Sequence, residues 1–239
     1  MNRLLVPRRA AAPLAEAAVL KSVTASYFLL RRGLAALAFA FPVLLWLGAG
    51  YAHPQGSISA YYHYREVASG YSPYGSGAMR NVFVGVLWAI GSFLFFYRGY
   101  SRFEDRILDV AGIAAILVSL FPMDWPPAAD SVRSWTATVH YASAVAFFLA
   151  TAFVCIFLSG ETLECLKDEA KKRRFRRVYR LLGMLMVATP ASVVVLHLLL
   201  GARAQSLVVL FVEVAGIYVF AAYWAVKSRE IALLERQSR

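Results

Sequence analysis

The chain has 239 residues, of which 60% are hydrophobic and only 16% are charged. A soluble domain usually carries about 25% charged residues, so this composition argues against an ordinary soluble protein and excludes a disordered one. The 25 Lys and Arg against 14 Asp and Glu give a net charge of +11. The two cysteines, Cys155 and Cys165, are too few for a disulfide-rich scaffold.

The first 32 residues precede any long apolar block and are expected to lie in the cytoplasm. Prolines and charges interrupt this segment, so it lacks the apolar core of a signal peptide. Residues 14–30 are a candidate interfacial helix ahead of the first span.

Six apolar blocks follow, each close to the roughly 20 residues that span a bilayer. They predict an all-α polytopic membrane protein with a bundle of six transmembrane helices over residues 33–227. The expected spans are 33–52, 81–97, 107–123, 134–160, 178–202 and 206–226. An external loop is expected at 53–79 and a cytoplasmic tail at 228–239.

The basic residues predict the orientation of the bundle. If the connections alternate between two sides, 21 of the 25 Lys and Arg fall on the side of the N-terminus and four on the other. The positive-inside rule then places both termini in the cytoplasm of a bacterial inner membrane. Because the basic residues stand between apolar blocks, no nucleic-acid partner is expected. Membrane lipids are the expected partners, and other membrane protein subunits are a further alternative.

Glu213 is the residue in most need of explanation, because it falls seven residues into the sixth span. That places its carboxylate roughly 10 Å inside the apolar region, where it needs a partner or a proton. His197 near the outer end of the fifth span is expected at a similar depth. A His197–Glu213 pair is therefore one hypothesis, and a structural hydrogen bond to a neighbouring helix is the other.

The expected external loop is rich in Tyr, Ser and Gly, which suits either a membrane–water interface or the cap of a ligand pocket. The candidate ligand-binding residues all fall in the outer half of the bundle. They are Ser59, Tyr62, His63, Arg80, Asn81, His140, His197 and Glu213.

No cofactor is predicted, and zinc is the alternative. Its ligands would be His63, His140, His197 and Asp124, which are residue types that zinc accepts. No pair of them has the spacing of an HxxxH or HExxH motif.

Several segments resemble a group of uncharacterised bacterial integral membrane proteins over about residues 35–227. The resemblance lies in Ser57-Ile58-Ser59-Ala60-Tyr61-Tyr62, Arg80-Asn81-Val82-Phe83-Val84-Gly85 and Leu120-Phe121-Pro122. It implies a helical membrane fold and no particular activity.

A more distant resemblance is to the alkaline ceramidases and progestin/adiponectin-type receptors. Those proteins have seven helices and hold zinc with three His near a Ser and an Asp. Ser59 and His63 stand four residues apart, as the Ser and first His do there. The chain departs from that pattern in having six expected spans and no paired His on a late helix.

Three functions follow from these features. The first is a non-enzymatic membrane protein whose outward-facing polar pocket binds a small ligand or lipid head group, or which acts as an accessory subunit. The second is a metal-dependent hydrolase of a lipid amide or ester, with Glu213 or Asp124 as the base. The third is a proton-coupled transporter with Glu213 as the relay, which ranks lower because no second intramembrane acid is recognised.

Overall fold

The structure is a computed structural model that describes residues 8–50, 54–64, 77–125, 133–200 and 207–238. Within these ranges all of the regular secondary structure is helical. Six long helices are present: α1 (Arg8–Gly48), α3 (Ala78–Phe96), α4 (Arg102–Leu120), α5 (Trp135–Phe153), α6 (Glu169–Leu200) and α7 (Leu207–Ser238). Three short turns join them: η1 (Ser59–His63), the π-helical η2 (Val154–Leu158) and η3 (Glu161–Cys165).

Five helical segments in these ranges are long and apolar enough to cross a membrane. They are Ser22–Gly48, Ala78–Phe96, Trp135–Cys165, Glu169–Leu196 and Leu207–Leu234. The predicted class of helical multi-pass membrane protein is confirmed at this level. The sixth long helix, α4, carries Glu104, Asp105 and Asp109 in its first two turns and is more polar.

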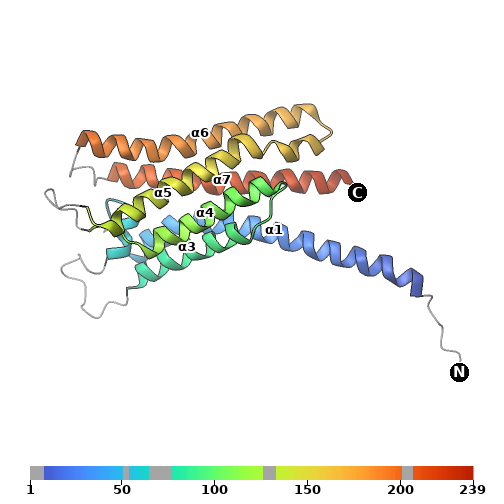
Figure 1. Cartoon of the computed structure of the whole chain (residues 1–239), viewed down its shortest axis with the longest axis horizontal. Coiled ribbons are helices and arrows are strands. Elements are labelled where there is room, and N and C mark those ends of the chain that lie inside the picture. The colour runs from blue at the N-terminus through green and yellow to red at the C-terminus, as the bar shows by residue number, and fades with distance from the viewer. Residues whose placement is uncertain (1–7, 51–53, 65–76, 126–132, 201–206, 239) are drawn as a thin grey trace, which may run out of the picture.

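The six long helices form a closed ring in chain order. Each helix packs against the next one along the chain, and α1 packs against α7 to close the ring (Figure 1). Successive helices alternate in direction, so α1 begins at the same end of the bundle at which α7 finishes. We call this end, with the α3–α4 and α5–α6 connections, the Lys227 end. The opposite end, with η1 and the start of α7, is the Glu213 end.

The interior of the ring holds two connected apolar clusters. The cluster toward the Lys227 end is strongly aromatic and includes Tyr97, Tyr179, Phe220, Tyr223 and Trp224. The cluster toward the Glu213 end joins α1, α3 and α4 to the segment around η1. Large side chains therefore fill the half of the ring toward the Lys227 end. Residues 54–64 cover the half toward the Glu213 end.

Two glycines allow α3 and α4 to approach closely. A methyl group added at Gly91 would lie 2.7 Å from the carbonyl oxygen of Gly112, and one added at Gly112 would lie 2.5 Å from the carbonyl oxygen of Gly91. Small residues at a crossing let two backbones pack directly. The polar helix α4 is thereby held between α3 and α5.

The helices differ from the expected spans mainly at the Lys227 end. α1 is continuous from Arg8, so the segment 14–30 that was expected as a separate interfacial helix is its N-terminal part. α6 starts at Glu169 and α7 runs to Ser238, beyond the expected boundary at residue 227. Of the expected external loop, only residues 54–64 and 77–79 lie within the described ranges.

The glycine crossing yields a first prediction. Gly112→Ala should destabilise the protein by about 1–3 kcal/mol, because the added methyl group meets backbone atoms that cannot rotate away. Thermal unfolding in mild detergent measures the change. Gly85→Ala on α3 is the control, since a methyl group there meets no atom within 4 Å and Ala favours the helix. Equal unfolding midpoints for the two variants would contradict the packing described.

Candidate functional site

Residues 54–64, between α1 and α3, fold into the mouth of the ring. Ile58, Ala60, Tyr61 and Tyr64 are all buried there. The Tyr64 hydroxyl donates to the carbonyl oxygen of Ala49 at the end of α1. These contacts fix a short turn, η1, directly above the helix interior.

Glu213 on α7 is bound by this segment. The Ser57 hydroxyl donates to the Glu213 carboxylate at 2.9 Å, and the backbone N–H of Ile58 donates to the same carboxylate at 2.6 Å. Two donors account for the polar contacts that the described residues make to this carboxylate, which can accept about four hydrogen bonds. Glu213 therefore ties the η1 segment to α7.

A cavity of about 120 Å³ lies below this contact, inside the ring. Its polar lining groups are Ser59 and Glu213, and the rest of its wall is apolar. The wall comes from α1, α3, α4, α5 and α7 and consists of Ala38, Phe41, Ile58, Phe83, Leu87, Ile90, Ala115, Val118, Ala144, Phe147, Phe148, Ile217 and Phe220. A carboxylate and a hydroxyl thus stand at one end of an otherwise apolar space.

Ser59 and His140 form a hydrogen-bonded pair beside the cavity. The Nε2 atom of His140 lies 2.9 Å from the Ser59 hydroxyl, while its Nδ1 atom lies 2.8 Å and 3.0 Å from the carbonyl oxygens of Phe121 and Val118. Because a carbonyl oxygen only accepts, Nδ1 carries the proton and Nε2 accepts from Ser59. His140 also satisfies carbonyl groups at the C-terminal end of α4, which the helix itself leaves free.

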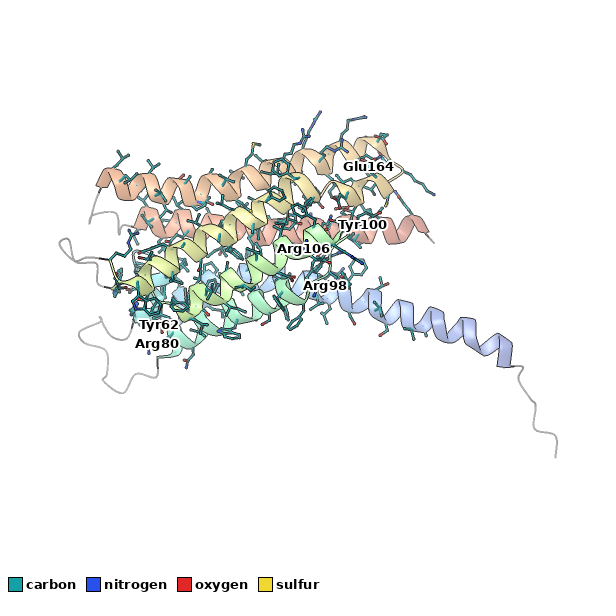
Figure 2. The ribbon with its side chains drawn as sticks, in the orientation of Figure 1. Tyr62, Arg80, Arg98, Tyr100, Arg106 and Glu164 are labelled. Carbon is teal, nitrogen blue, oxygen red and sulfur yellow. The ribbon has the colours of Figure 1, made fainter. Side chains whose placement is uncertain are left out.

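Three further predicted residues gather around η1. The Nε2 atom of His63 donates to the carbonyl oxygen of Met123 at 2.8 Å, and burial lowers the pKa of this imidazole. The Arg80 guanidinium stacks over the Tyr62 ring at 4.9 Å and lies near its carbonyl oxygen. Figure 2 shows Tyr62 and Arg80 together at the Glu213 end of the bundle.

Asp124 and Asn81 are not among the residues that line the cavity. Asp124 accepts from the backbone N–H and hydroxyl of Ser134, which caps α5, and these bonds lower the pKa of its carboxyl group. Asn81 is exposed on α3. The side chain of His197 lies outside the described residues, so the proposed His197–Glu213 pair stays a prediction.

The described residues hold no group of three or more His, Cys, Asp or Glu side chains that could bind a metal ion. His63 and His140 each bond to backbone carbonyl oxygens, and Asp124 bonds to Ser134. In this part of the chain, His63, His140 and Asp124 therefore each bond to a different group of the protein.

A second polar site lies at the opposite end, where sequence reasoning expected a cytoplasmic tail. Lys227 is 2% exposed and Glu230 is fully buried, and the Lys227 Nζ atom lies 3.3 Å from the Glu230 carboxylate. The same ammonium group donates to the Thr162 hydroxyl at 2.6 Å and lies 3.4 Å from the carbonyl oxygen of Ser159. Glu230 also accepts hydrogen bonds from Thr162 and Tyr179.

Two more buried charges flank this pair. Arg31 on α1 donates to the Tyr97 hydroxyl at 2.8 Å and lies over the Tyr27 and Tyr97 rings. Glu104 folds back at the start of α4 and accepts from the backbone N–H of Tyr100 at 2.7 Å. With Lys227 and Glu230, the site holds two cations and two carboxylates, so its formal charges cancel and burial is tolerable.

Local structure explains how the chain builds this second site. The π-helical turn η2 at the end of α5 widens the helix, and Ser159 then bonds to the Val154 carbonyl and the Tyr223 hydroxyl. Wide turns of this kind are frequent at functional sites. Ser101 and Glu104 have the spacing of a capping box, and Lys227 and Glu230 stand three apart on one helix face. These spacings were the available signals in the sequence.

Glu104 and Glu230 correct one conclusion drawn from the sequence. A second acid inside the membrane region was not recognised, because both residues fall near basic segments that read as cytoplasmic. The structure buries both of them, and Glu230 lies within the apolar segment Leu207–Leu234. Glu213 is therefore not the only buried acid among the described residues, and the absence of a second acid no longer counts against a transporter.

The buried pair gives a second prediction. Lys227→Met should destabilise the protein by about 3–5 kcal/mol, because it leaves the buried Glu230 without its cation. The double variant Lys227→Met/Glu230→Gln should lose less stability than the sum of the single variants. Unfolding in detergent measures all three. Asp109→Asn, which breaks an exposed pair with Arg98, is the control and should change stability by less than about 1 kcal/mol.

Comparison with known proteins gives a family and no activity. The model of the family described as "Protein of unknown function (DUF998)" matches residues 33–229. No curated protein and no solved structure matches the chain. The matched region contains all of the long helices but the first part of α1 and the end of α7, and it includes Glu213, His140 and Lys227. The chain therefore belongs to the DUF998 family.

Proposed function

We propose that the protein crosses a bacterial inner membrane six times, with both termini in the cytoplasm. Six helices of alternating direction support this topology, and so does the concentration of Lys and Arg in the segments of the Lys227 end. On this proposal α4 also crosses the membrane, in addition to the five apolar segments, and α3 and α5 shield it from lipid. The Glu213 end then faces outward.

The main function proposed is the binding of a small amphipathic molecule at the Glu213 end. One observation carries the proposal: the Glu213 carboxylate borders a cavity whose other lining groups, apart from Ser59, are apolar. A buried carboxylate is costly unless it is hydrogen-bonded or paired with a cation. Ser57 and Ile58 supply two donors, and a bound ligand would supply another.

The size and chemistry of the cavity define the ligand class. A cavity of about 150 Å³ accommodates benzene, so the 120 Å³ here suits a small ring or a short alkyl group. The carboxylate favours a cationic or hydrogen-bond-donating head over an anionic one. We therefore expect an apolar amine, or a lipid head group that carries an ammonium, to fit better than a carboxylic acid of the same shape.

The third prediction tests this preference with benzylamine and benzoate, which share a ring and differ in charge. Benzylamine should raise the thermal unfolding midpoint of the purified full chain in a saturable way, while benzoate should not. Glu213→Gln should abolish the shift, because the amide loses the charge. Ala144→Leu should abolish it independently, because it fills the cavity and leaves Glu213 unchanged.

The control for charge is Glu164→Gln, an exposed carboxylate at the opposite end of the bundle (Figure 2). It should keep the full response to benzylamine. Equal responses to benzylamine and benzoate, or a normal response in both Glu213→Gln and Ala144→Leu, would contradict the proposal.

A second candidate is hydrolysis of a lipid ester or amide, which the Ser59–His140 hydrogen bond favours. A nucleophile bonded to a base, with the base oriented by a third group, is the arrangement used in acyl transfer. His140 would take the Ser59 proton as Oγ attacks the carbonyl carbon. It would then pass that proton to the leaving oxygen or nitrogen, and water would release the acyl group from Ser59.

The fourth prediction separates this chemistry from a structural role for the pair. A fluorophosphonate probe should label Ser59, as located by peptide mass spectrometry, and His140→Gln should reduce the labelling at least tenfold, in line with the 10²–10⁴-fold effect of a general base. Ser192→Ala, which removes an exposed hydroxyl on α6, should keep the label on Ser59. Absence of an adduct in the wild-type protein, or equal labelling of His140→Gln, would overturn the candidate.

A further inference from the structure

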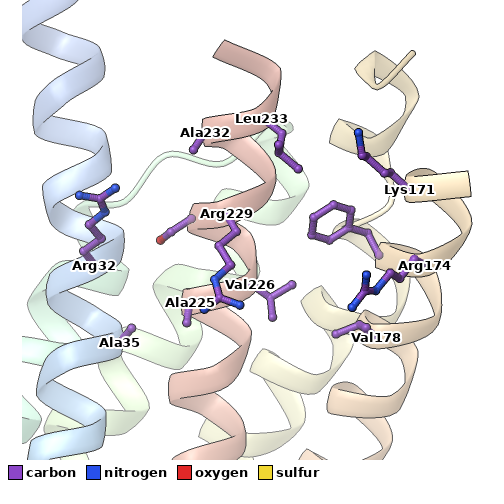
Figure 3. Close-up of a pocket in the computed structure, with 12 residues that line it drawn as sticks. Arg32, Ala35, Lys171, Arg174, Val178, Ala225, Val226, Arg229, Ala232 and Leu233 are labelled. Atoms are coloured by element: carbon purple, nitrogen blue, oxygen red, sulfur yellow. The ribbon is translucent and has the colours of Figure 1, made fainter. Parts of the chain in front are cut away.

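A large basic groove lies at the Lys227 end, on the outside of the ring. Its volume is about 730 Å³, and it runs between α1, α6 and α7. Figure 3 shows Arg32 of α1 on one side of Arg229 of α7, with Lys171 and Arg174 of α6 on the other side. Four cationic side chains from three separate helices therefore border one space.

Within the described part of the chain, these cations have few carboxylate partners. None of the residues that line the groove is acidic. Among the described residues, no carboxylate forms a salt bridge with Arg32, Arg174 or Arg229, and Lys171 has one exposed contact with Asp168. By contrast, Lys172 and Arg176 on the same helix pair with Glu164. The sequence thus supplies acids for the other side of α6 and leaves the groove positive.

The rest of the groove wall is mostly apolar. Ala35, Phe175, Val178, Ala225, Val226, Ala232 and Leu233 line it together with Ser228. Lys171 and Arg174 fall near the start of the apolar segment Glu169–Leu196, and Arg229 falls near the end of Leu207–Leu234. Arg32 lies within Ser22–Gly48, directly before the expected start of the first span at residue 33. A positive rim above apolar helix faces matches the level at which lipid phosphate groups meet acyl chains.

We propose that this groove binds the phosphate of an anionic phospholipid head group, with the acyl chains lying along α1, α6 and α7. Arginine suits this role because its planar guanidinium donates two parallel hydrogen bonds to phosphate oxygens. The volume lies in the range of about 300–1,000 Å³ found for ligand sites. The groove and the Glu213 cavity occupy opposite ends of the bundle, so the two proposals stand independently.

The fifth prediction compares two triple variants that remove the same charge. The groove variant is Arg32→Gln/Arg174→Gln/Arg229→Gln, and the control variant is Arg106→Gln/Arg173→Gln/Arg177→Gln, which changes exposed arginines outside the groove. Native mass spectrometry of the full chain in detergent would measure the Kd for phosphatidylglycerol and for phosphatidylcholine. If each charge contributes about 1 kcal/mol, the groove variant should bind phosphatidylglycerol more than tenfold more weakly.

The control variant should bind phosphatidylglycerol within about twofold of the wild type, because its charges act only through the general field of the surface. Binding of phosphatidylcholine should fall less than that of phosphatidylglycerol in the groove variant, because its ammonium group cancels the phosphate charge. Equal losses in the two triple variants would overturn the site and leave a non-specific electrostatic effect. If the groove variant fails to fold, Arg229→Gln and Arg173→Gln form the matched single pair.

Inorganic phosphate and pyrophosphate distinguish the source of the phosphate group. If a lipid is the ligand, millimolar concentrations of either ion should leave bound phosphatidylglycerol in place, since they cannot replace the acyl-chain contacts. Displacement by either ion would overturn the lipid assignment and identify the groove as a site for soluble phosphorylated molecules.

Discussion

A polar group inside a membrane-spanning bundle has to find its partner within the chain, because lipid offers no hydrogen bonds. This constraint governs both ends of the ring. At the Glu213 end, a hydroxyl and a backbone N–H of the 54–64 segment bind a carboxylate of α7. At the Lys227 end, two cations and two carboxylates share one buried site. The middle of the ring is closed by apolar and aromatic side chains.

The two sites differ in how fully their polar groups are satisfied. Lys227 and Glu230 contact each other, the hydroxyl groups of Thr162 and Tyr179, and the carbonyl oxygen of Ser159. Such a closed network specifies how α5, α6 and α7 pack. Glu213 has two donors and an adjacent cavity. The closed network fits a structural role, whereas the proposed binding role rests on the Glu213 carboxylate that borders the cavity.

Charge has two separate uses in this chain. Most of the basic residues lie in the connections at one end of the bundle. The proposed orientation in the membrane rests on this asymmetry. Arg31 and Lys227 belong to the same end but are buried in the ring and neutralised there. Arg32 and Arg229, one helix position or two away from those residues, face the groove outside. Adjacent positions on one helix point in different directions, so neighbouring cations serve the core and the lipid-facing surface.

The sequence by itself determined the membrane class, the positions of the apolar helices and the importance of Glu213, because apolar length and a lone intramembrane charge are local properties. It also predicted that Ser59, His63 and His140 lie at one end of the bundle. Only the tertiary structure decided that Ser57 and Ile58 bind Glu213. It alone revealed the buried Lys227–Glu230 pair and the groove, because those depend on the rotation of each helix and on which helices close the ring.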